Sequence, residues 1–267
     1  MNNRDYQSMP WVSSHWLISL LKSPAECWRK YIDPNRTMQE PTDSMKFGTL
    51  IHCLILTPKL FEQEFLISNV QRRSLSGKTQ YAELSAAGKI LISPSQYARA
   101  QAIVSALKSN SDAFKLLRYG SKEKTIFQPR HRQLLPLKAR LDVLNQTKHL
   151  VVELKTTYSI QAIETAIERY RYYLSASFYR DISKSKTVNF VFVQTAEPFQ
   201  VKILEMTPEQ LQIGKEQYQS ALRLFDECWS SNHWPEAEPP SKLEDELCVP
   251  SHFLPKRYDL PVGELAL

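Results

Sequence analysis

Residues 137–157, with the sequence LKARLDVLNQTKHLVVELKTT, read as two β-strands joined by a polar turn. Side chains of a strand point alternately to opposite faces of its sheet. In the second strand, Glu153 and Lys155 therefore share one face, while Leu154 points to the other. Asp142 lies near the end of the first strand and can converge on the same point. The stretch predicts two acids and a lysine gathered at one place on a sheet.

This combination of side chains is suited to chemistry on a phosphodiester. Two carboxylates beside a lysine can hold a divalent cation and polarise a phosphate and a water. Asp142 and Glu153 offer hard oxygen ligands for Mg²⁺ or Mn²⁺, and the backbone carbonyl of Leu154 would lie within reach of the same ion. Lys155 could orient or help deprotonate the attacking water. Glu123, on the preceding strand, could add a further carboxylate.

The spacing of these residues alone is weak evidence, because acids and lysines at strand ends often form surface ion pairs. The setting favours a site, since Glu153 and Lys155 interrupt an otherwise apolar strand. A charged pair in a half-buried strand is costly unless it is paired or liganded.

The N-terminal half of the chain is expected to be helical. Residues 1–10 are polar and are expected to be loose, whereas residues 13–31 and 93–117 carry apolar side chains at helical spacing. The run MKFGTLIHCLILTPKLFEQEF, residues 45–65, predicts a strongly apolar helix that ends or kinks at its proline. His52 is the polar group in its middle, and such a histidine is more often a core or surface residue than a ligand.

The second half of the chain alternates strands and helices. An antiparallel meander of about three strands from Glu123 to Thr157 precedes a long helix over residues 159–182. Two strands with a turn at Glu197-Pro198 follow, and Thr207-Pro208 opens a final amphipathic helix. We therefore expect an α/β (α+β) fold in which a mixed central sheet is flanked by helices.

The domain boundaries follow from the same pattern. Residues 1–235 are expected to form a single domain, with a helical part at about 12–118 and a β-rich part at about 119–235. Residues 236–267 form a proline-rich tail that cannot be a regular element.

The net charge of +6 favours an acidic partner such as nucleic acid, although a mildly basic surface without a special partner would look the same. Arg72, Arg73 and Lys78 form a basic loop around Gly77 that could contact phosphates or could simply be solvated.

The four cysteines are scattered without a CxxC pair, so the chain lacks the spacing of a zinc site. No signal peptide is visible, and the longest apolar runs are too short for a membrane helix. We therefore expect a cytoplasmic protein with reduced thiols and no membrane association.

Several segments together resemble the RecE-type (exonuclease VIII) branch of the PD-(D/E)xK nuclease superfamily, over roughly residues 12–235. Asp142, Glu153 and Lys155 match its metal-binding signature, and the ending LKTT matches its (D/E)xKTT pattern. The segments SSHWLISLLKSPAEC, FGTLIH and the basic loop resemble that group's opening, its histidine-bearing helix and its basic segment. Leu141 stands where the superfamily's proline is often found.

The resemblance implies a restriction-endonuclease-like core with Mg²⁺ or Mn²⁺, two ions per site, held by Asp142 and Glu153. It places Glu123 and His52 close to the metals and has Lys155 act on the water. These five residues are the candidate catalytic residues, and the candidate metal ligands are Asp142, Glu153, Leu154, His52 and Glu123.

The helix after the meander usually carries a glutamine and a tyrosine in this group. Tyr179 fits the tyrosine, but Ser175 stands at the glutamine position. Candidate DNA contacts are therefore Tyr179 and Ser175, the basic-loop residues, and Arg140, which shares a strand face with Asp142. The nearby Tyr170, Tyr172 and Tyr173 are expected to be core or interface residues and not platforms for bases.

The function implied by the resemblance is metal-dependent degradation of one strand from a duplex DNA end, 5′ to 3′. The single-stranded tail would serve recombination with an annealing protein, and the enzyme would be a ring-shaped homo-oligomer. An endonuclease or a RecB-like repair nuclease is an alternative, and a catalytically idle DNA-binding module is another. Intact Asp142, Glu153 and Lys155 argue against the idle module.

Overall fold

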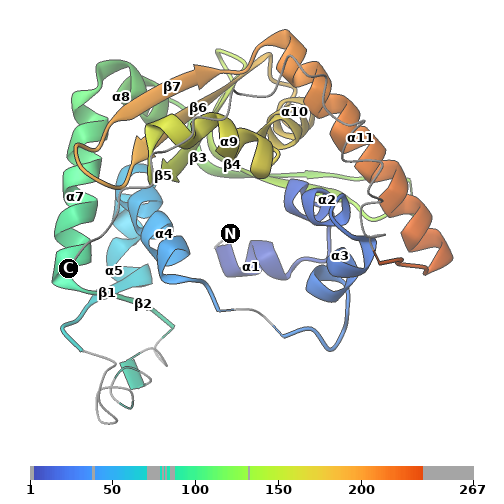
Figure 1. Cartoon of the computed structure of the whole chain (residues 1–267), viewed down its shortest axis with the longest axis horizontal. Helices are drawn as coiled ribbons and strands as arrows, with labels where there is room; N and C mark the ends of the chain where they lie inside the picture. The colour runs from blue at the N-terminus through green and yellow to red at the C-terminus, as the bar shows by residue number, and fades with distance from the viewer. Residues whose placement is uncertain are drawn as a thin grey trace, which may run out of the picture.

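The computed structural model describes residues 3–37, 40–70, 79, 81, 83–84, 88–131 and 133–236. The predictions for Arg72, Arg73 and Lys78 lie outside these residues, as does the tail beyond Glu236. Figure 1 shows one twisted sheet with helices on both of its sides.

The main sheet has five strands in the order β3-β4-β5-β6-β7. Their bounds are β3 (Ser121–Gln128), β4 (Leu137–Asn145), β5 (Leu150–Thr157), β6 (Thr187–Gln194) and β7 (Val201–Glu205). Neighbouring strands are antiparallel except for β5 and β6, which are parallel. The sheet is therefore mixed and flanked by helices, which confirms the predicted restriction-endonuclease-like core.

Because β5 and β6 are parallel, the chain must cross over between them. The crossover holds a short 3₁₀ turn, η2 (Ile160–Ala162), and two helices, α9 (Ile163–Arg169) and α10 (Tyr172–Ser183). The sequence predicted one continuous helix here, and that prediction is wrong. Arg171 adopts a left-handed conformation with φ of 50°, which interrupts the helix and turns α10 away from α9.

Two hydrophobic clusters cover the two faces of the sheet. Helices α2 (Ser14–Leu20), α10 and α11 (Pro208–Ser231) pack on one face, through residues such as Leu17, Phe178 and Phe225. Helices α4 (Asp43–Leu56), α7 (Pro94–Ser109) and α8 (Ser111–Arg118) pack on the other. In Figure 1, α7 and α8 stand on one side of the molecule and α11 on the opposite side.

The helix starts follow the local sequence. Ser23 accepts a hydrogen bond from the Glu26 amide at the start of α3 (Pro24–Tyr31), and Thr42 accepts one from Met45 at the start of α4. Thr207 forms a capping box with Gln210, so the predicted final helix begins at Pro208 as expected. The region 93–117 is two helices, because Asn110 ends α7 and caps α8.

Residues 3–8, expected to be loose, form a short helix, α1 (Asn3–Ser8). The reason is a buried lysine on β4. Lys138 is 2% exposed, and its Nζ donates hydrogen bonds to the carbonyl oxygens of Tyr6 and Met9, each at 2.7 Å. In the view of Figure 1, α1 lies between α4 and α2.

A small parallel sheet, β1 (Phe65–Ile67) with β2 (Ile90–Ile92), was not foreseen. Its strands are only three residues long, too short for a clear alternating pattern. It is preceded by η1 (Pro58–Leu60) and α5 (Phe61–Glu64), which follow α4 at the predicted proline. No helix among the described residues is long and apolar enough to cross a membrane.

Candidate metal centre

The central pair of strands separates at the predicted acids. β4 and β5 are paired near their turn, from Asn145 opposite Leu150 up to Val143 opposite Val152. Beyond this point, the Leu154 amide donates to Asp142 Oδ2 at 2.7 Å, and the Asp142 amide donates to Glu153 Oε1 at 3.3 Å. Two side-chain carboxylates thus take the place of backbone carbonyls, and they stand between the diverging strands.

The alternation of β4 shifts at the same place. Leu141 and Leu144 both contact the hydrophobic cluster on the α2–α10 face, although they are three positions apart, and Val143 contacts the opposite cluster. A regular strand would put residues three apart on opposite faces. Regular alternation up to Leu141 places the Asp142 carboxylate on the far side of the sheet, near α4, and the shift puts Val143 on that side as well.

Helix α4 brings His52 to this carboxylate. The His52 Nδ1 atom lies 3.6 Å from Asp142 Oδ1. Gly48, one turn earlier, faces β5, and a Cβ atom at that position would lie 3.4 Å from Thr156 Oγ1. This is an ordinary van der Waals distance, so α4 packs against the strand that carries Glu153 at this position.

Glu123 reaches the same point from β3. The register of β3 and β4, with Lys122 opposite Val143 and Lys124 opposite Leu141, places Glu123 across from Asp142. Glu123 has a φ of 49°, a conformation that is uncommon for a residue with a side chain. One ligand atom each from His52, Glu123 and Asp142 all lie within 4.8 Å of one another.

This donor set fits a hard divalent cation. Mg²⁺ and Mn²⁺ prefer carboxylate oxygens, which Asp142 and Glu123 supply, and an imidazole nitrogen is a common further ligand. Asp142 is 9% exposed and the side chains of His52 and Glu123 are 25% and 22% exposed, so an ion would be held in a partly buried place. The metal set predicted from sequence thus has three members gathered in one group, with Glu153 on the adjacent strand.

Glu153 and Lys155 form a buried ion pair beside this group. Lys155 Nζ donates to Glu153 Oε2 at 2.9 Å, and the Glu153 side chain is 2% exposed. The ammonium also lies 5.9 Å from the centroid of the Tyr172 ring. Breaking a buried pair by removing one partner is strongly destabilising, so each charge depends on the other.

The charges shift the pKa values of the group in different directions. Burial and then the negative charge of Asp142 raise the pKa of Glu153 to about 7. Burial opposes ionisation of Asp142, but the charge of His52 and a hydrogen bond to it outweigh burial and lower the pKa of Asp142. Burial favours neutral Lys155, but Glu153 and Asp142 outweigh it, so the pKa of Lys155 is raised.

Arg140 was expected to balance Asp142 or to touch a phosphate. In the structure, its Nε donates to Glu123 Oε2 at 2.6 Å, with both side chains mostly buried. The arginine therefore holds the third carboxylate of the group in place. Any contact with DNA by Arg140 remains a prediction.

Tyr179 and Ser175 both lie on α10 and are buried, at 6% and 8% exposure. The Tyr179 hydroxyl accepts a hydrogen bond from Ser14 Oγ at 3.1 Å, which joins α10 to α2. The contacts of these two residues thus support the walls of the site, and their predicted DNA contacts are untested.

Tyr6 was missed by the sequence reasoning. Burial raises its pKa, and the charges of Tyr179, Arg140 and Glu153 also act on it, so its hydroxyl lies close to the site. The polar sequence around Tyr6 carries no signal of this position, because the helix is held there by Lys138, more than a hundred residues away.

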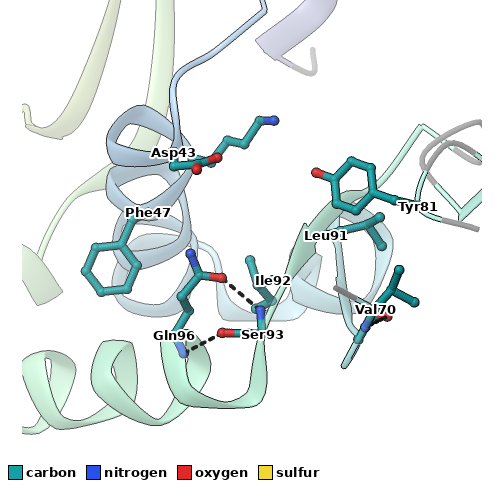
Figure 2. Close-up of a pocket in the computed structure, with 10 residues that line it drawn as sticks. Asp43, Phe47, Val70, Tyr81, Leu91, Ile92, Ser93 and Gln96 are labelled. Carbon is teal, nitrogen blue, oxygen red and sulfur yellow. Dashed lines mark hydrogen bonds between the residues drawn. The ribbon is translucent and has the colours of Figure 1, made fainter. Parts of the chain in front are cut away.

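A separate pocket lies at the start of α4, between α7 and β2 (Figure 2). It has a volume of about 170 Å³, and Phe47, Tyr81 and Ile92 are among its lining residues. Ser93 and Gln96, also in its wall, are engaged in the capping box of α7, as the dashed lines in Figure 2 show. None of the predicted site residues that the structure describes lines this pocket.

The geometry described above agrees with the family to which the sequence belongs. Residues 13–239 match the family described as "PDDEXK-like domain of unknown function (DUF3799)", so the chain is a member of that family. Membership in a PDDEXK-like family supports a nuclease. It does not by itself identify the RecE-type branch.

A solved structure shares the fold. The chain is similar to a protein from Eubacterium rectale named "Putative exonuclease", with a TM-score of 0.63 and 11% identity, over 92% of this chain and 96% of that one. A phage related exonuclease from Haemophilus somnus 129PT is 13% identical over 81% of this chain and 95% of that one, but its TM-score of 0.34 is too low to support an argument. No match to a curated protein was found.

Proposed function

We propose that this protein is a metal-dependent deoxyribonuclease that hydrolyses phosphodiester bonds from duplex DNA ends. The observation that carries the proposal is the convergence of His52, Glu123 and Asp142 beside the Glu153–Lys155 pair, where β4 and β5 separate. A group of carboxylates, a lysine and an imidazole in one partly buried place can hold a cation and act on a phosphodiester.

Each residue has a role that follows from its contacts. Asp142 and Glu123 would hold the cation, with Glu153, His52 and the Leu154 carbonyl as further ligands. When bound, Mg²⁺ or Mn²⁺ supplies positive charge that polarises the phosphate. Lys155 is held beside Glu153 as an ammonium, so it would position the attacking water by donating hydrogen bonds. Arg140 keeps Glu123 oriented.

The finer features of the proposal come from the sequence resemblance. These are the 5′ to 3′ direction, two metal ions per site, the ring-shaped oligomer, and a role in recombination with an annealing protein. An endonuclease is the alternative that the same site would also serve, and the choice of substrate separates the two.

The decisive experiment compares end-labelled linear duplex with closed circular DNA, in Mg²⁺ or Mn²⁺ and in EDTA. We expect the linear duplex to be shortened from its ends only when the cation is present, and the circle to stay intact. Label placed on the 5′ or the 3′ end reports the direction. Cutting of the circle would refute the exonuclease and favour the endonuclease.

Variants test the assigned residues. Asp142→Asn and Lys155→Ala should lose at least a hundredfold in rate, as expected when a charge that acts in the transition state is removed. Asp112→Asn and Lys108→Ala change exposed residues of the same types on α7 and α8, and they should keep full activity. Full activity in Asp142→Asn would show that the site is elsewhere.

A further inference from the structure

A second pocket opens directly beside the candidate metal centre. It has a volume of about 380 Å³ and lies between α2, α3 and the α9–α10 segment. Lys155 and Tyr179 form part of its wall, so the pocket is continuous with the site where the phosphodiester bond would be cut. This volume falls within the range of small-ligand sites and towards its lower end.

The rim of this pocket is positively charged. Lys22, Lys30 and Arg169 line it and are exposed, and none of the three forms an ion pair with another described residue. Glu26 is the one acid among the lining residues that the structure describes. Cations at the mouth of a pocket that no protein carboxylate neutralises attract an anionic ligand, and phosphate is the anion for which lysine and arginine are best suited.

An exposed aromatic ring stands at the same pocket. Tyr170 is 50% exposed, so of the core and interface positions expected for it, it does not occupy the core. Its ring stacks on Tyr172 with centroids 5.8 Å apart, and Tyr172 stacks in turn on Phe190 at 5.3 Å. Arg169 lies 5.7 Å from the centroid of the Tyr170 ring. A ring held rigidly in this way offers a platform on which a nucleobase can stack.

A buried hydroxyl in the wall lacks a partner. Ser19 lines the pocket and is 4% exposed, and its Oγ has no hydrogen-bond partner among the described residues. A hydroxyl in a helix can bond to the carbonyl one turn back, but this one does not. Buried polar atoms are nearly always satisfied, so this hydroxyl points to a polar ligand or a water in the pocket.

We propose that the pocket binds an unpaired nucleotide of the strand that is cut, with its base against Tyr170 and its phosphate among Lys22, Lys30 and Arg169. This inference rests on the proposed function, because it places the ligand beside Lys155. It adds a specificity: a nucleotide that is already unpaired enters without the cost of leaving the base stack. DNA ends with unpaired terminal nucleotides are therefore better substrates than fully paired ends.

The binding step is tested without cleavage, in EDTA, with a short fluorescent single-stranded DNA and the full-length protein. Anisotropy measures affinity, and a gel run afterwards shows that the DNA is intact. Tyr170→Ala should weaken binding by about fivefold to about a hundredfold, the range found for loss of a stacking ring, whereas Tyr170→Phe should bind like the wild type. Tyr158→Ala, which removes an 82% exposed tyrosine outside the pocket, is the matched control and should have no effect.

The phosphate contacts are tested by salt. Lys22→Ala and Lys30→Ala should each weaken binding and reduce the slope of log affinity against log salt by about one contact. Unchanged binding in Tyr170→Ala, or an equal loss in Tyr158→Ala, would overturn the proposal.

A cleavage assay separates this proposal from the proposed function. In Mg²⁺, duplexes with mismatched terminal pairs should be cut with a lower KM than fully paired ones, and Tyr170→Ala should remove the difference. If the wild type binds single strands through Tyr170 but never cleaves DNA, the proposed nucleotide-binding pocket is supported and the proposed nuclease activity is refuted. If the wild type cleaves DNA and Tyr170→Ala is indistinguishable from it in both assays, the proposed nuclease activity is supported and the proposed nucleotide-binding pocket is refuted.

Discussion

Replacing Gly214 by alanine is expected to destabilise the protein, although alanine is the better helix former. Gly214 lies in the first third of α11, where this helix crosses α10. A Cβ atom at this position would lie 1.9 Å from the carbonyl oxygen of Tyr173 and 2.6 Å from Ser177 Oγ. The first of these neighbours is backbone and cannot rotate away, so the two helices must separate.

The size of the effect follows from these distances. A carbon and a carbonyl oxygen approach to about 3.3 Å, so α11 would have to move by more than about 1 Å. Overpacking of this kind costs about 1–3 kcal/mol and sometimes more. Alanine gains about 1 kcal/mol over glycine in a helix, which offsets part of that cost. Because the clash is with backbone, we take the upper end of that range, which leaves a net loss of about 2 kcal/mol. With a shift of about 2–4 °C per kcal/mol for a domain of this size, we expect Tm to fall by about 4–8 °C.

The assay is thermal unfolding followed by far-ultraviolet circular dichroism, in EDTA so that a bound cation adds nothing. Ile213→Ala is the control, because Ile213 is the next residue on the same helix and is 47% exposed. It should change Tm only slightly. A rise in Tm for Gly214→Ala would mean that helix propensity governs this position and that α10 and α11 are not in the close contact described above.

Three further predictions concern the site and the N-terminal helix. The pKa of Glu153 is raised to about 7, above its ordinary 4.5, so between these pH values the folded cation-free protein holds a proton that the unfolded chain releases. The Tm of the protein should therefore fall as pH rises from about 5 to about 8. In a pH series, Glu153→Gln should flatten that fall. Lys138→Met should speed hydrogen exchange of residues 3–9, measured by mass spectrometry, whereas the exposed Lys124→Met should leave it unchanged. Glu123→Gln should weaken Mn²⁺ binding in calorimetry by at least about tenfold, and an equal loss with the exposed Glu62→Gln would contradict the assigned ligand set.

The core of the fold was accessible from the sequence because it depends on local patterns, whereas the grouping of Glu123 and His52 with Asp142 was predicted from the resemblance to a known family. Period-two alternation and polar turns define β4 and β5, and the interruption of an apolar strand by Glu153 and Lys155 drew attention to the site. The structure brings these residues together with Asp142, Glu123 and His52. Their roles in catalysis remain predictions.

What the sequence did not show depends on contacts between distant segments. The helix break at Arg171 results from a left-handed backbone conformation, which the presence of an arginine does not predict. Likewise, α1 forms because a lysine on β4 supplies partners for its carbonyl groups. Local propensity cannot reveal partners of this kind.

The separation of β4 and β5 bears on how variants of the site should be interpreted. The amides of Leu154 and Asp142 find their acceptors on the carboxylates of Asp142 and Glu153, and not on the opposite strand. These carboxylates therefore form hydrogen bonds that link the two strands, in addition to being candidate metal ligands. Truncating Asp142 to alanine would remove both a metal ligand and the acceptor of the Leu154 amide hydrogen bond, whereas asparagine keeps an oxygen that can accept this bond. The two amide protons are in turn natural reporters of the site, since any ligand that draws the carboxylates away should change their chemical shifts.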